Sequence, residues 1–247
     1  MATKLKKLYE GKAKIIYAKN SNQVIATYKN DATAFNNLKK GSIKNKGAIN
    51  NSISSYLFQI LNHCDIPTHF IKKIDKKSQL LKKVDIIPIE VLVRNLFAGS
   101  LSKKFGIKEG TPLSDTLIEY CLKSDELGDP HISSEHILNL GLCDFNELEL
   151  IDEYSLRIND VLRSTFFSIG INLIDFKLEF GICKKTNEIV LADEISPDTC
   201  RLWDLKTNKK LDKDRFRRDL GNVEEAYAEV LDRLNSVSYT HIRAHET

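Results

Sequence analysis

The sequence predicts an α+β protein in two lobes. Three observations predict it: β-branched runs grouped near the start of the chain, long amphipathic helical patterns further on, and alternating polar and apolar strands between them. The chain has 247 residues, 42% hydrophobic and 29% charged, which suffices for a sizeable core and a solvated surface. We therefore expect an N-terminal antiparallel β lobe over 1–85 and a larger α+β lobe over 86–236.

The N-terminal part contains mainly strand patterns. Residues 14–18 and 23–28 are β-branched runs separated by a KNSN turn, which is typical of a hairpin. Residues 48–63 place apolar side chains three and four apart, which predicts a helix that ends before Pro67. Further strands are expected near 68–74, 79–84 and 87–95.

The C-terminal part alternates between helix and strand patterns. Residues 100–145 are punctuated by glycine and proline, so we expect short elements on long connections. The longest helical pattern covers 146–169 and is closed by Gly170. Strand patterns at 171–182 and 188–194 flank a KKTNE turn and predict a second hairpin.

The end of the chain divides into a helix and a tail. Residues 212–234 predict a helix with a break at Gly221. Residues 237–247 do not continue this pattern and resemble the translation of a sequencing adapter, so we expect no functional role for them. His241 and His245 have the spacing of metal ligands on a helix, but in such a tail we expect no metal site.

Composition excludes several classes of protein. The 37 basic and 34 acidic residues give a net charge of +3, too small for a general attraction to nucleic acid or membrane, and we expect neither as a partner. No apolar run approaches the roughly 18 residues of a membrane span. The cysteines are scattered without a Cys-x-x-Cys pair, which favours reduced thiols and a cytoplasmic location. They are Cys64, Cys121, Cys143, Cys183 and Cys200.

The most informative strand has three charged residues on one face. Strand side chains alternate, so Asp175, Lys177 and Glu179 share a face while the apolar residues between them face the core. If the hairpin is symmetric about Thr186, Glu179 lies opposite Asp193, with Cβ atoms roughly 5 Å apart. Two carboxylates so close repel each other unless a cation lies between them, which indicates a Mg²⁺ site for a nucleotide. The alternative is a solvated strand face neutralised by Lys177.

An SPD turn follows this hairpin and delivers further polar side chains to the same end of the sheet. They are Asp198, the last residue of the turn, and Arg201, three residues later. Arg201 suits a phosphate or a carboxylate, and the alternative is a surface ion pair.

Three basic segments suit phosphorylated ligands. Lys12 and Lys14 follow Gly11 on one strand face and suit a polyphosphate, although from this motif alone a solvated lysine edge is favoured. Arg94 before the Gly-Ser turn at Ser100 suits a phosphate monoester. The alternative there is an internal pair of Arg94 with the preceding glutamate, Glu90. The KDRFRR segment at 213–218 begins a helix, for which a solvated face is favoured.

Two long motifs resemble a known family. IIPIEVLVRNLFAGS at 86–100 and LIDFKLEFG at 173–181 resemble the signature stretches of the phosphoribosylaminoimidazole-succinocarboxamide synthase (SAICAR synthase) family. YEGKAKIIY, KNDATAFN, DEISPDTCRLWD and LDKDRFRRDLG also resemble family segments and occur in the same order. The resemblance covers residues 5–234. It implies the family's two-lobed fold, related to ATP-grasp and kinase-like folds, with a nucleotide in the cleft.

The resemblance also implies an activity. Members of this family are ATP-dependent ligases of purine biosynthesis that join carboxyaminoimidazole ribonucleotide (CAIR) to L-aspartate, releasing ADP and phosphate, with an acyl phosphate as the expected intermediate. The implied cofactors are ATP and Mg²⁺, and the implied assembly is a homodimer.

Residue roles follow from the matched positions. The resemblance implies that nucleotide and metal are held by Gly11, Lys12, Lys14, Lys82, Lys123, Glu179 and Asp193, with the last two as Mg²⁺ ligands. It implies a reacting centre of Asp175, Lys177 and Arg94. The implied substrate ligands are Arg94, Ser100, Asp129, His131, Arg201, Lys213 and Arg215.

Two other functions use parts of the same pattern. A phosphotransferase with a stable acceptor would need the same lysines and carboxylates. A nucleic-acid-binding module could use the lysine-rich strands at 72–83, but the near-neutral charge and the lack of an aromatic stacking pattern argue against it. One departure from the family is Asn36-Asn37, where many relatives have Asn-Gly, so the geometry of that loop is left open.

Overall fold

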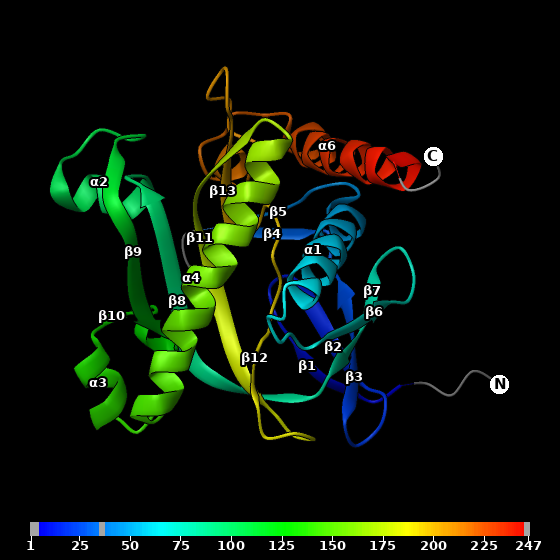
Figure 1. Ribbon diagram of the computed structural model, residues 1–247, viewed down its shortest axis with the longest axis vertical. Coiled ribbons are helices and arrows are strands. Elements are labelled where there is room, and N and C mark those ends of the chain that lie inside the picture. Colours follow the sequence, from blue (N-terminus) through cyan, green and yellow to red (C-terminus); the bar gives the residue numbers. More distant parts are fainter. Residues whose placement is uncertain (1–4, 35–37, 245–247) are drawn as a thin grey trace.

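The computed structural model describes residues 5–34 and 38–244 and has two main sheets flanked by helices (Figure 1). The first sheet is antiparallel, in the order β1 (Lys7–Glu10), β2 (Lys14–Ala18), β3 (Gln23–Tyr28), β7 (Ser78–Lys82), β6 (Phe70–Lys73). The second has the order β10 (His131–Ile132), β9 (Pro112–Leu122), β8 (Val84–Leu96), β11 (Ile171–Cys183), β12 (Ile189–Leu191), with β13 (Cys200–Asp204) also on β11. A small ribbon pairs β4 (Asp31–Ala34) with β5 (Lys39–Ser42). The α+β class is confirmed.

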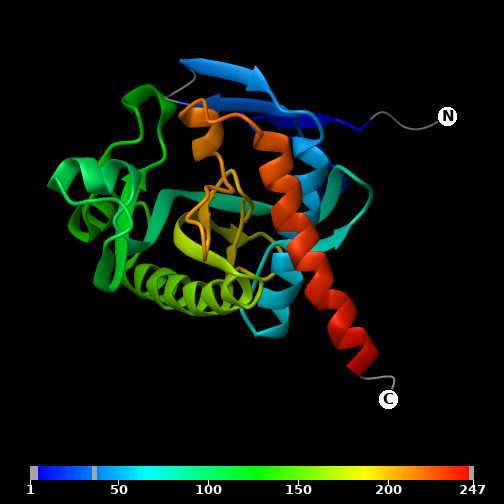
Figure 2. The same cartoon turned by 90° about the horizontal axis from the view of Figure 1, so that it is seen from above.

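Helices cover the sheets and close the core. They are α1 (Lys46–His63), α2 (Gly99–Phe105), α3 (Ser134–Asn139), α4 (Phe145–Ser168), α5 (Asp214–Arg217) and α6 (Val223–Ala244), with a 3₁₀ turn at Asp125–Leu127. Helix α4 packs on β8 and β11, whereas α1 packs on β3, β6 and β7 and against α6 (Figures 1 and 2). Within the described residues, no helix is both long and apolar enough to span a bilayer.

One hydrophobic core extends through both sheets. Val24 of β3, Leu57 of α1, Leu162 of α4 and Phe176 of β11 belong to the same buried cluster. The chain leaves the first sheet at Lys82 and enters the second at Val84. The division into lobes at 1–85 and 86–236 therefore follows the sheets, but it stays a prediction.

The two sheets join at a short crossing point. Thr68 forms a parallel bridge with Leu191 of β12. The next residue, His69, donates its main-chain N–H to the Leu191 carbonyl (2.8 Å) and accepts from the Lys82 N–H (2.7 Å). The main chain at His69 is thus bonded to both sheets, which fixes the residues around it relative to each other.

Most predicted elements are confirmed. The hairpin of β2 and β3, the long helix α4 and the break at Gly221 (φ 66°) between α5 and α6 all form. The expectation that the chain leaves the helix at residue 237 is wrong, because α6 continues to Ala244. Residues 100–145 are also more regular than expected, since β9 is a long strand paired with β8. Asn36, Asn37 and the side chains of 237–247 lie outside the described part.

The register of the second hairpin differs from the prediction by one residue. Gly181 pairs with Val190, so the turn is centred between Lys185 and Thr186 rather than on Thr186. The Glu179 carbonyl accepts from the N–H of Ala192 (2.8 Å), and Asp193 is therefore not directly opposite Glu179. The turn contains Asn187 at φ 57°, a left-handed conformation that asparagine tolerates, and this sets the register.

Candidate active site

Two adjoining cavities share part of their lining. The larger one (≈ 660 Å³), here the lysine cavity, combines an apolar wall with the side chains of Lys12, Lys14, Lys82, Lys123 and Lys177. The smaller one (≈ 360 Å³), here the arginine cavity, contains Arg94, Arg201 and Arg217 with Ser100 and Asp175. Both are lined by Lys12, Glu90, Lys177, Asp198, Thr199 and Lys213. Ligands in the two cavities would therefore meet at this shared wall.

The charged face of β11 points into these cavities. Asp175 and Glu179 are 5% and 4% exposed, and Lys177 lines both cavities. The predicted sharing of one face is confirmed, and the alternative of a solvated strand face is wrong, because the carboxylates are buried in ion pairs. Their neighbours on the other face, Phe176 and Leu178, belong to the hydrophobic core, as the alternation predicts.

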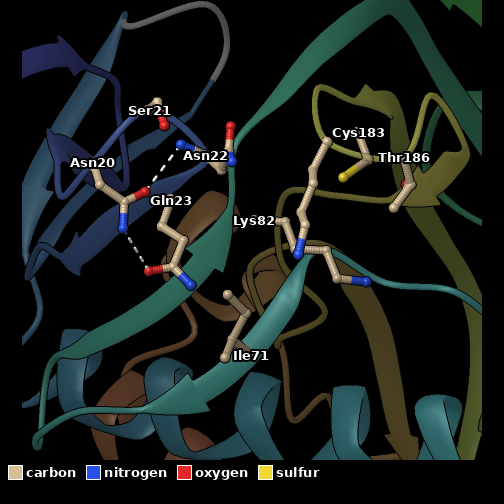
Figure 3. Close-up of a pocket in the computed structure, with 9 residues that line it drawn as sticks. Asn20, Ser21, Asn22, Gln23, Ile71, Lys82, Cys183 and Thr186 are labelled. Carbon is tan, nitrogen blue, oxygen red and sulfur yellow. Dashed lines mark hydrogen bonds between the residues drawn. The ribbon is translucent and has the colours of Figure 1, made fainter.

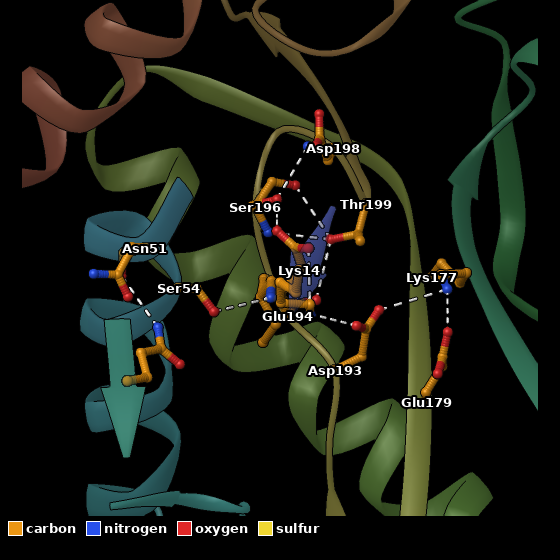
Figure 4. Close-up of polar contacts among 12 residues, drawn as sticks. Lys14, Asn51, Ser54, Lys177, Glu179, Asp193, Glu194, Ser196, Asp198 and Thr199 are labelled. Atoms are coloured by element: carbon orange, nitrogen blue, oxygen red, sulfur yellow. Dashed lines mark hydrogen bonds and ion pairs between the residues drawn. The ribbon is translucent and has the colours of Figure 1, made fainter. Parts of the chain in front are cut away.

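Lysines bind the carboxylates of the lysine cavity (Figure 4). Lys177 contacts Glu179, Glu90 (2.9 Å) and Asp193 (3.6 Å). Lys14 bonds to Asp193 (2.5 Å), and Lys123 bonds to Glu179 (2.8 Å). These contacts place the positive charges of three lysines around three carboxylates.

The ion pairs keep these groups charged despite their burial. Burial alone would lower the pKa of Lys14, but the Asp193 and Glu194 carboxylates raise it above its ordinary value. The pKa of Lys177 is raised in the same way by Glu179 and Asp193. Burial would raise the pKa of Asp193, yet Lys14 and Lys177 lower it. At neutral pH the cavity therefore contains lysine cations and carboxylate anions.

Asp193 reaches this site by a different route from the predicted one. It follows β12 at φ 56°, a left-handed conformation that turns the chain out of the strand. The Asp193 and Glu179 carboxylates both line the lysine cavity and both contact Lys177, although the predicted pairing of these two residues across the hairpin was wrong. Two carboxylates beside space for phosphates are a donor set that Mg²⁺ accepts. In the described residues, no group of three or more acidic, histidine or cysteine ligands forms a protein-only metal cluster.

Carboxylates also fix the guanidinium groups of the arginine cavity. Arg94 binds Glu119 (2.6 Å) and Asp175 (3.0 Å), and Arg201 binds the same Asp175 (2.7 Å). The alternative pairing of Arg94 with Glu90 is wrong, because Glu90 binds Lys177. The arginine positions are thus set by buried acids.

Asp214 completes the arginine cluster. It binds Arg201 (3.1 Å) and Arg217 (2.7 Å). Burial would raise the pKa of Asp214, but these two guanidinium groups lower it to about 2. Gly99 (φ 56°) lies directly against Arg201, and a Cβ there would approach the guanidinium to 2.3 Å, so the glycine makes room for the arginine.

A buried ion pair anchors the loop that forms the shared wall. Lys46 at the start of α1 binds Asp198 (2.5 Å), and the two side chains are 1% and 5% exposed. The Tyr227 hydroxyl of α6 also donates to Asp198 (2.7 Å). Burial would raise the pKa of Asp198, whereas Lys46 and the neighbouring Lys213 lower it to about 2. The sequence gives no sign of this anchor, because its partners come from distant segments.

Most predicted site residues line one of the two cavities. The lysine cavity contains Gly11, Lys12, Lys14, Lys82, Lys123, Asp129, Lys177, Glu179, Asp193 and Lys213. The arginine cavity contains Arg94, Ser100, Asp175, Lys177, Arg201 and Lys213.

Two predicted residues lie outside both linings. His131 is exposed on β10. Arg215 donates to the main-chain carbonyls of Lys210, Leu220 and Gly221, which ties together the segment between β13 and α6. Arg217 lines the arginine cavity instead. The KDRFRR pattern predicts a basic segment, but which of its arginines faces the arginine cavity depends on the orientation of the four-residue helix α5.

A third cavity (≈ 570 Å³) lies at the turn between β2 and β3 (Figure 3). Its lining includes the residues Asn20–Gln23, Cys183 and Thr186, and it shares Lys82 with the lysine cavity. No sequence motif predicted it.

A mixed apolar and cationic cavity that shares a wall with an arginine-rich one is typical of an enzyme site and suits two phosphorylated ligands side by side. The profile of the SAICAR synthetase family matches residues 7–234, and the chain belongs to this family.

Individual relatives agree with this assignment. The phosphoribosylaminoimidazole-succinocarboxamide synthase of Clostridium botulinum is 56% identical over 94% of this chain and 99% of its own. The crystal structure of the Ehrlichia chaffeensis enzyme of the same name has a TM-score of 0.91 and 53% identity, covering 93% of this chain and 98% of its own. A SAICAR synthetase in complex with ADP has a TM-score of 0.90 and 44% identity, covering 92% of this chain and 97% of its own.

Proposed function

We propose that this chain is the ATP-dependent ligase that joins the carboxylate of CAIR to the amino group of L-aspartate, giving SAICAR, ADP and phosphate in purine biosynthesis. The observation that carries this proposal is the shared wall of the lysine and arginine cavities, with Lys177 and Glu90 between them. A reaction between two phosphorylated substrates needs such a meeting point.

The lysine cavity suits ATP. Its apolar wall accommodates a base, and Lys12 and Lys14 after Gly11 suit the phosphates. Lys82 and Lys123 line the same space. Glu179 and Asp193 would hold Mg²⁺, which would neutralise phosphate charge when bound.

The arginine cavity suits the ribonucleotide. Arg94 and Arg201 present fixed guanidinium groups beside Ser100, an arrangement that binds a phosphate monoester or neighbouring hydroxyls. Lys213 and Arg217 line the same cavity and would bind the carboxylates of L-aspartate. Asp129 and Lys123 line the lysine cavity, on the side proposed for the nucleotide.

The chain's own residues orient the reactants and neutralise charge. Asp175 fixes the planes of Arg94 and Arg201. Lys177 lines both cavities, so it would lie where the CAIR carboxylate meets the γ-phosphate. Transfer of the γ-phosphoryl group to a carboxylate oxygen releases ADP and gives an acyl phosphate. The aspartate amine then forms the C–N bond, the C–O bond to phosphate breaks, and inorganic phosphate and one amine proton are released.

The test is dependence on aspartate. With ATP, Mg²⁺ and CAIR, the purified protein should form SAICAR only when L-aspartate is present, measured by its absorbance and mass. A phosphotransferase would release ADP at full rate without aspartate and form no amide, and that result would reject the ligase.

We also infer a homodimer and a cytoplasmic location. The homodimer is the habit of the family, and light scattering at the size of a single chain would reject it. All five cysteines are unpaired, which suits a reducing compartment.

A further inference from the structure

The loop that joins α2 to β9 (Figure 1) contains a carboxylate that is bonded to one wall of the arginine cavity from outside it. This residue is Glu109, which lines none of the three cavities of the described chain. Its Oε1 accepts the main-chain N–H of Gly99 (3.0 Å), the first residue of α2. The next residue, Ser100, lines the arginine cavity. Glu109 therefore holds the segment that presents the Ser100 hydroxyl.

The same carboxylate binds an arginine from a distant segment. Arg218, directly after α5, donates both Nη groups to Glu109, at 2.9 Å to Oε2 and 2.5 Å to Oε1. Two parallel bonds of this kind are stronger and more directional than one contact between point charges. The bond from Arg218 lowers the pKa of Glu109 to about 2, so the carboxylate is charged at neutral pH. Glu109 thus joins the start of α2 to the end of α5.

Arg218 is also close to the acid that positions Arg201. Its Nη2 lies 3.4 Å from Asp214 Oδ2, the same oxygen that accepts from Arg201 Nε (3.1 Å). Like charges repel, so a closer approach of Arg218 to this oxygen would displace Arg201. Because Glu109 takes both Nη groups of Arg218, the shorter contact of this oxygen is the one to Arg201.

The two segments that Glu109 joins meet at Arg201. A Cβ at Gly99 would approach the Arg201 guanidinium to 2.3 Å, so the main chain of this glycine lies directly against that side chain. Arg201 and Ser100 both line the arginine cavity. Their spacing depends on Gly99 on one side and on Asp214 on the other. Glu109 is bonded to the first and controls the competitor for the second.

We propose that Glu109 is a positioning residue for the phosphate monoester of the ribonucleotide. It holds the start of α2 against Arg201. It also keeps Arg218 away from Asp214. Ser100 and Arg201 then keep the spacing that the phosphate needs. This inference rests on the proposed binding of CAIR in the arginine cavity.

The Glu109→Gln variant removes the charge but leaves an oxygen for the Gly99 N–H. Arg218 should then turn to Asp214, and KM for CAIR should rise about tenfold. Both kcat at saturating CAIR and KM for ATP should stay within about twofold of wild type, since Glu109 lies outside both cavities. Steady-state rates, with one substrate varied and the others saturating, measure this. An unchanged KM for CAIR, or an equal rise in both KM values, would overturn the proposal.

A second substitution tests the part played by Arg218. Arg218→Met alone should leave KM for CAIR within about twofold of wild type, because Asp214 then binds Arg201 without a competitor. In the double variant, Glu109→Gln with Arg218→Met, KM for CAIR should return to within about threefold of wild type. An ion pair that only stabilised the loop would instead give similar rises in both single variants and no recovery in the double variant, which would overturn the proposal.

Glu229 on α6 supplies the matched control. Like Glu109, its side chain is 29% exposed, binds an arginine and a lysine, and lines no cavity found in the described residues. Glu229→Gln should lower the thermal midpoint about as much as Glu109→Gln, by at most a few degrees, and should leave KM for CAIR unchanged. A tenfold rise in the control would assign the effect to a general loss of stability and overturn the proposal.

These outcomes separate the inference from the proposed function. If the wild-type protein forms SAICAR and Glu109→Gln has an unchanged KM for CAIR, only the role of Glu109 is overturned. If the wild-type protein forms no SAICAR, both are overturned. Should Glu109→Gln fail to fold, Glu109→Asp decides, because the shorter side chain keeps the charge but cannot reach both Gly99 and Arg218. The same rise in KM for CAIR is expected from it, and an unchanged value would overturn the proposal.

Discussion

The lysine and arginine cavities hold their charged side chains in different ways. In the lysine cavity, flexible ammonium groups contact carboxylates that themselves line the space, such as Asp193 and Glu179. In the arginine cavity, Arg94 and Arg201 are both bound by one buried carboxylate, that of Asp175. The first arrangement can exchange partners when a ligand enters, whereas the second keeps its geometry.

This difference matches the chemistry proposed for each cavity. A lysine is a mobile point charge, which suits a polyphosphate whose terminal group departs during the reaction. An arginine held by a carboxylate is a rigid fork, which suits a phosphate monoester that only anchors its substrate. The predictions below test this contrast in order of expected effect.

Removing a carboxylate charge from the lysine cavity should have the largest effect. Glu179→Gln and Asp193→Asn should each lower kcat at saturating substrates by more than about a thousandfold, because both groups are proposed Mg²⁺ ligands. Steady-state rates at several Mg²⁺ concentrations measure this. The thermal midpoint should fall by only a few degrees, since lysines remain to be solvated by the open cavity. Wild-type turnover in either variant would reject the metal assignment.

Breaking the anchor of the shared wall should affect both cavities together. Lys46→Met leaves Asp198 buried without its cation, which should lower the free energy of unfolding by about 3–5 kcal/mol. Urea unfolding measures this loss, and KM for both nucleotides should rise. Lys44→Met, two residues earlier and exposed, is the matched control and should change stability by less than about 0.5 kcal/mol. A rise in KM for only one of the two nucleotides would show that the loop does not link the cavities.

Replacing a fixed fork by a point charge should affect the arginine cavity alone. Arg94→Lys cannot reach both Glu119 and Asp175, so KM for the ribonucleotide should rise by about 10- to 100-fold while KM for ATP changes little. Arg157→Lys provides the control, because Arg157 binds Glu153 on α4 and lines neither cavity. Unchanged KM and kcat in Arg94→Lys would remove this residue from the site.

The sequence predicted those parts of the site whose geometry depends on neighbouring residues along one strand. Alternation along a strand has a period of two, so the common face of Asp175, Lys177 and Glu179 could be predicted from the sequence. The register of the following turn depends on its backbone type, which the KKTNE segment does not determine, and the predicted register was wrong by one residue. Asp193 still reaches the cavity because its left-handed conformation redirects the chain.

Partners from distant segments could not be predicted. Lys46 meets Asp198, and Arg94 meets Glu119, through packing that no spacing rule encodes. Arg217 rather than Arg215 lines the cavity because of the orientation of a single helical turn. The family resemblance identified the segments that form the site. Which residue of each segment faces a cavity could be seen only in the fold.

The smallest effect is expected at the mouth of the lysine cavity. Lys12 binds Asp125 (2.7 Å), but these side chains are 42% and 71% exposed, so solvent screens the pair. Asp125→Asn should change the free energy of unfolding by less than about 0.5 kcal/mol. It should also leave KM for ATP unchanged or up to about twofold lower, because Lys12 no longer has a competing anion beside it.

The exposed neighbour Glu126, which has no ion pair with a lysine of the described chain, supplies the control Glu126→Gln. Titrating salt from low to physiological concentration should remove the difference between the two variants, since screening weakens an exposed pair. A rise of tenfold in KM for Asp125→Asn would instead mean that this acid helps to hold the nucleotide, and the contrast between exchangeable and fixed charges would then fail at this edge of the cavity.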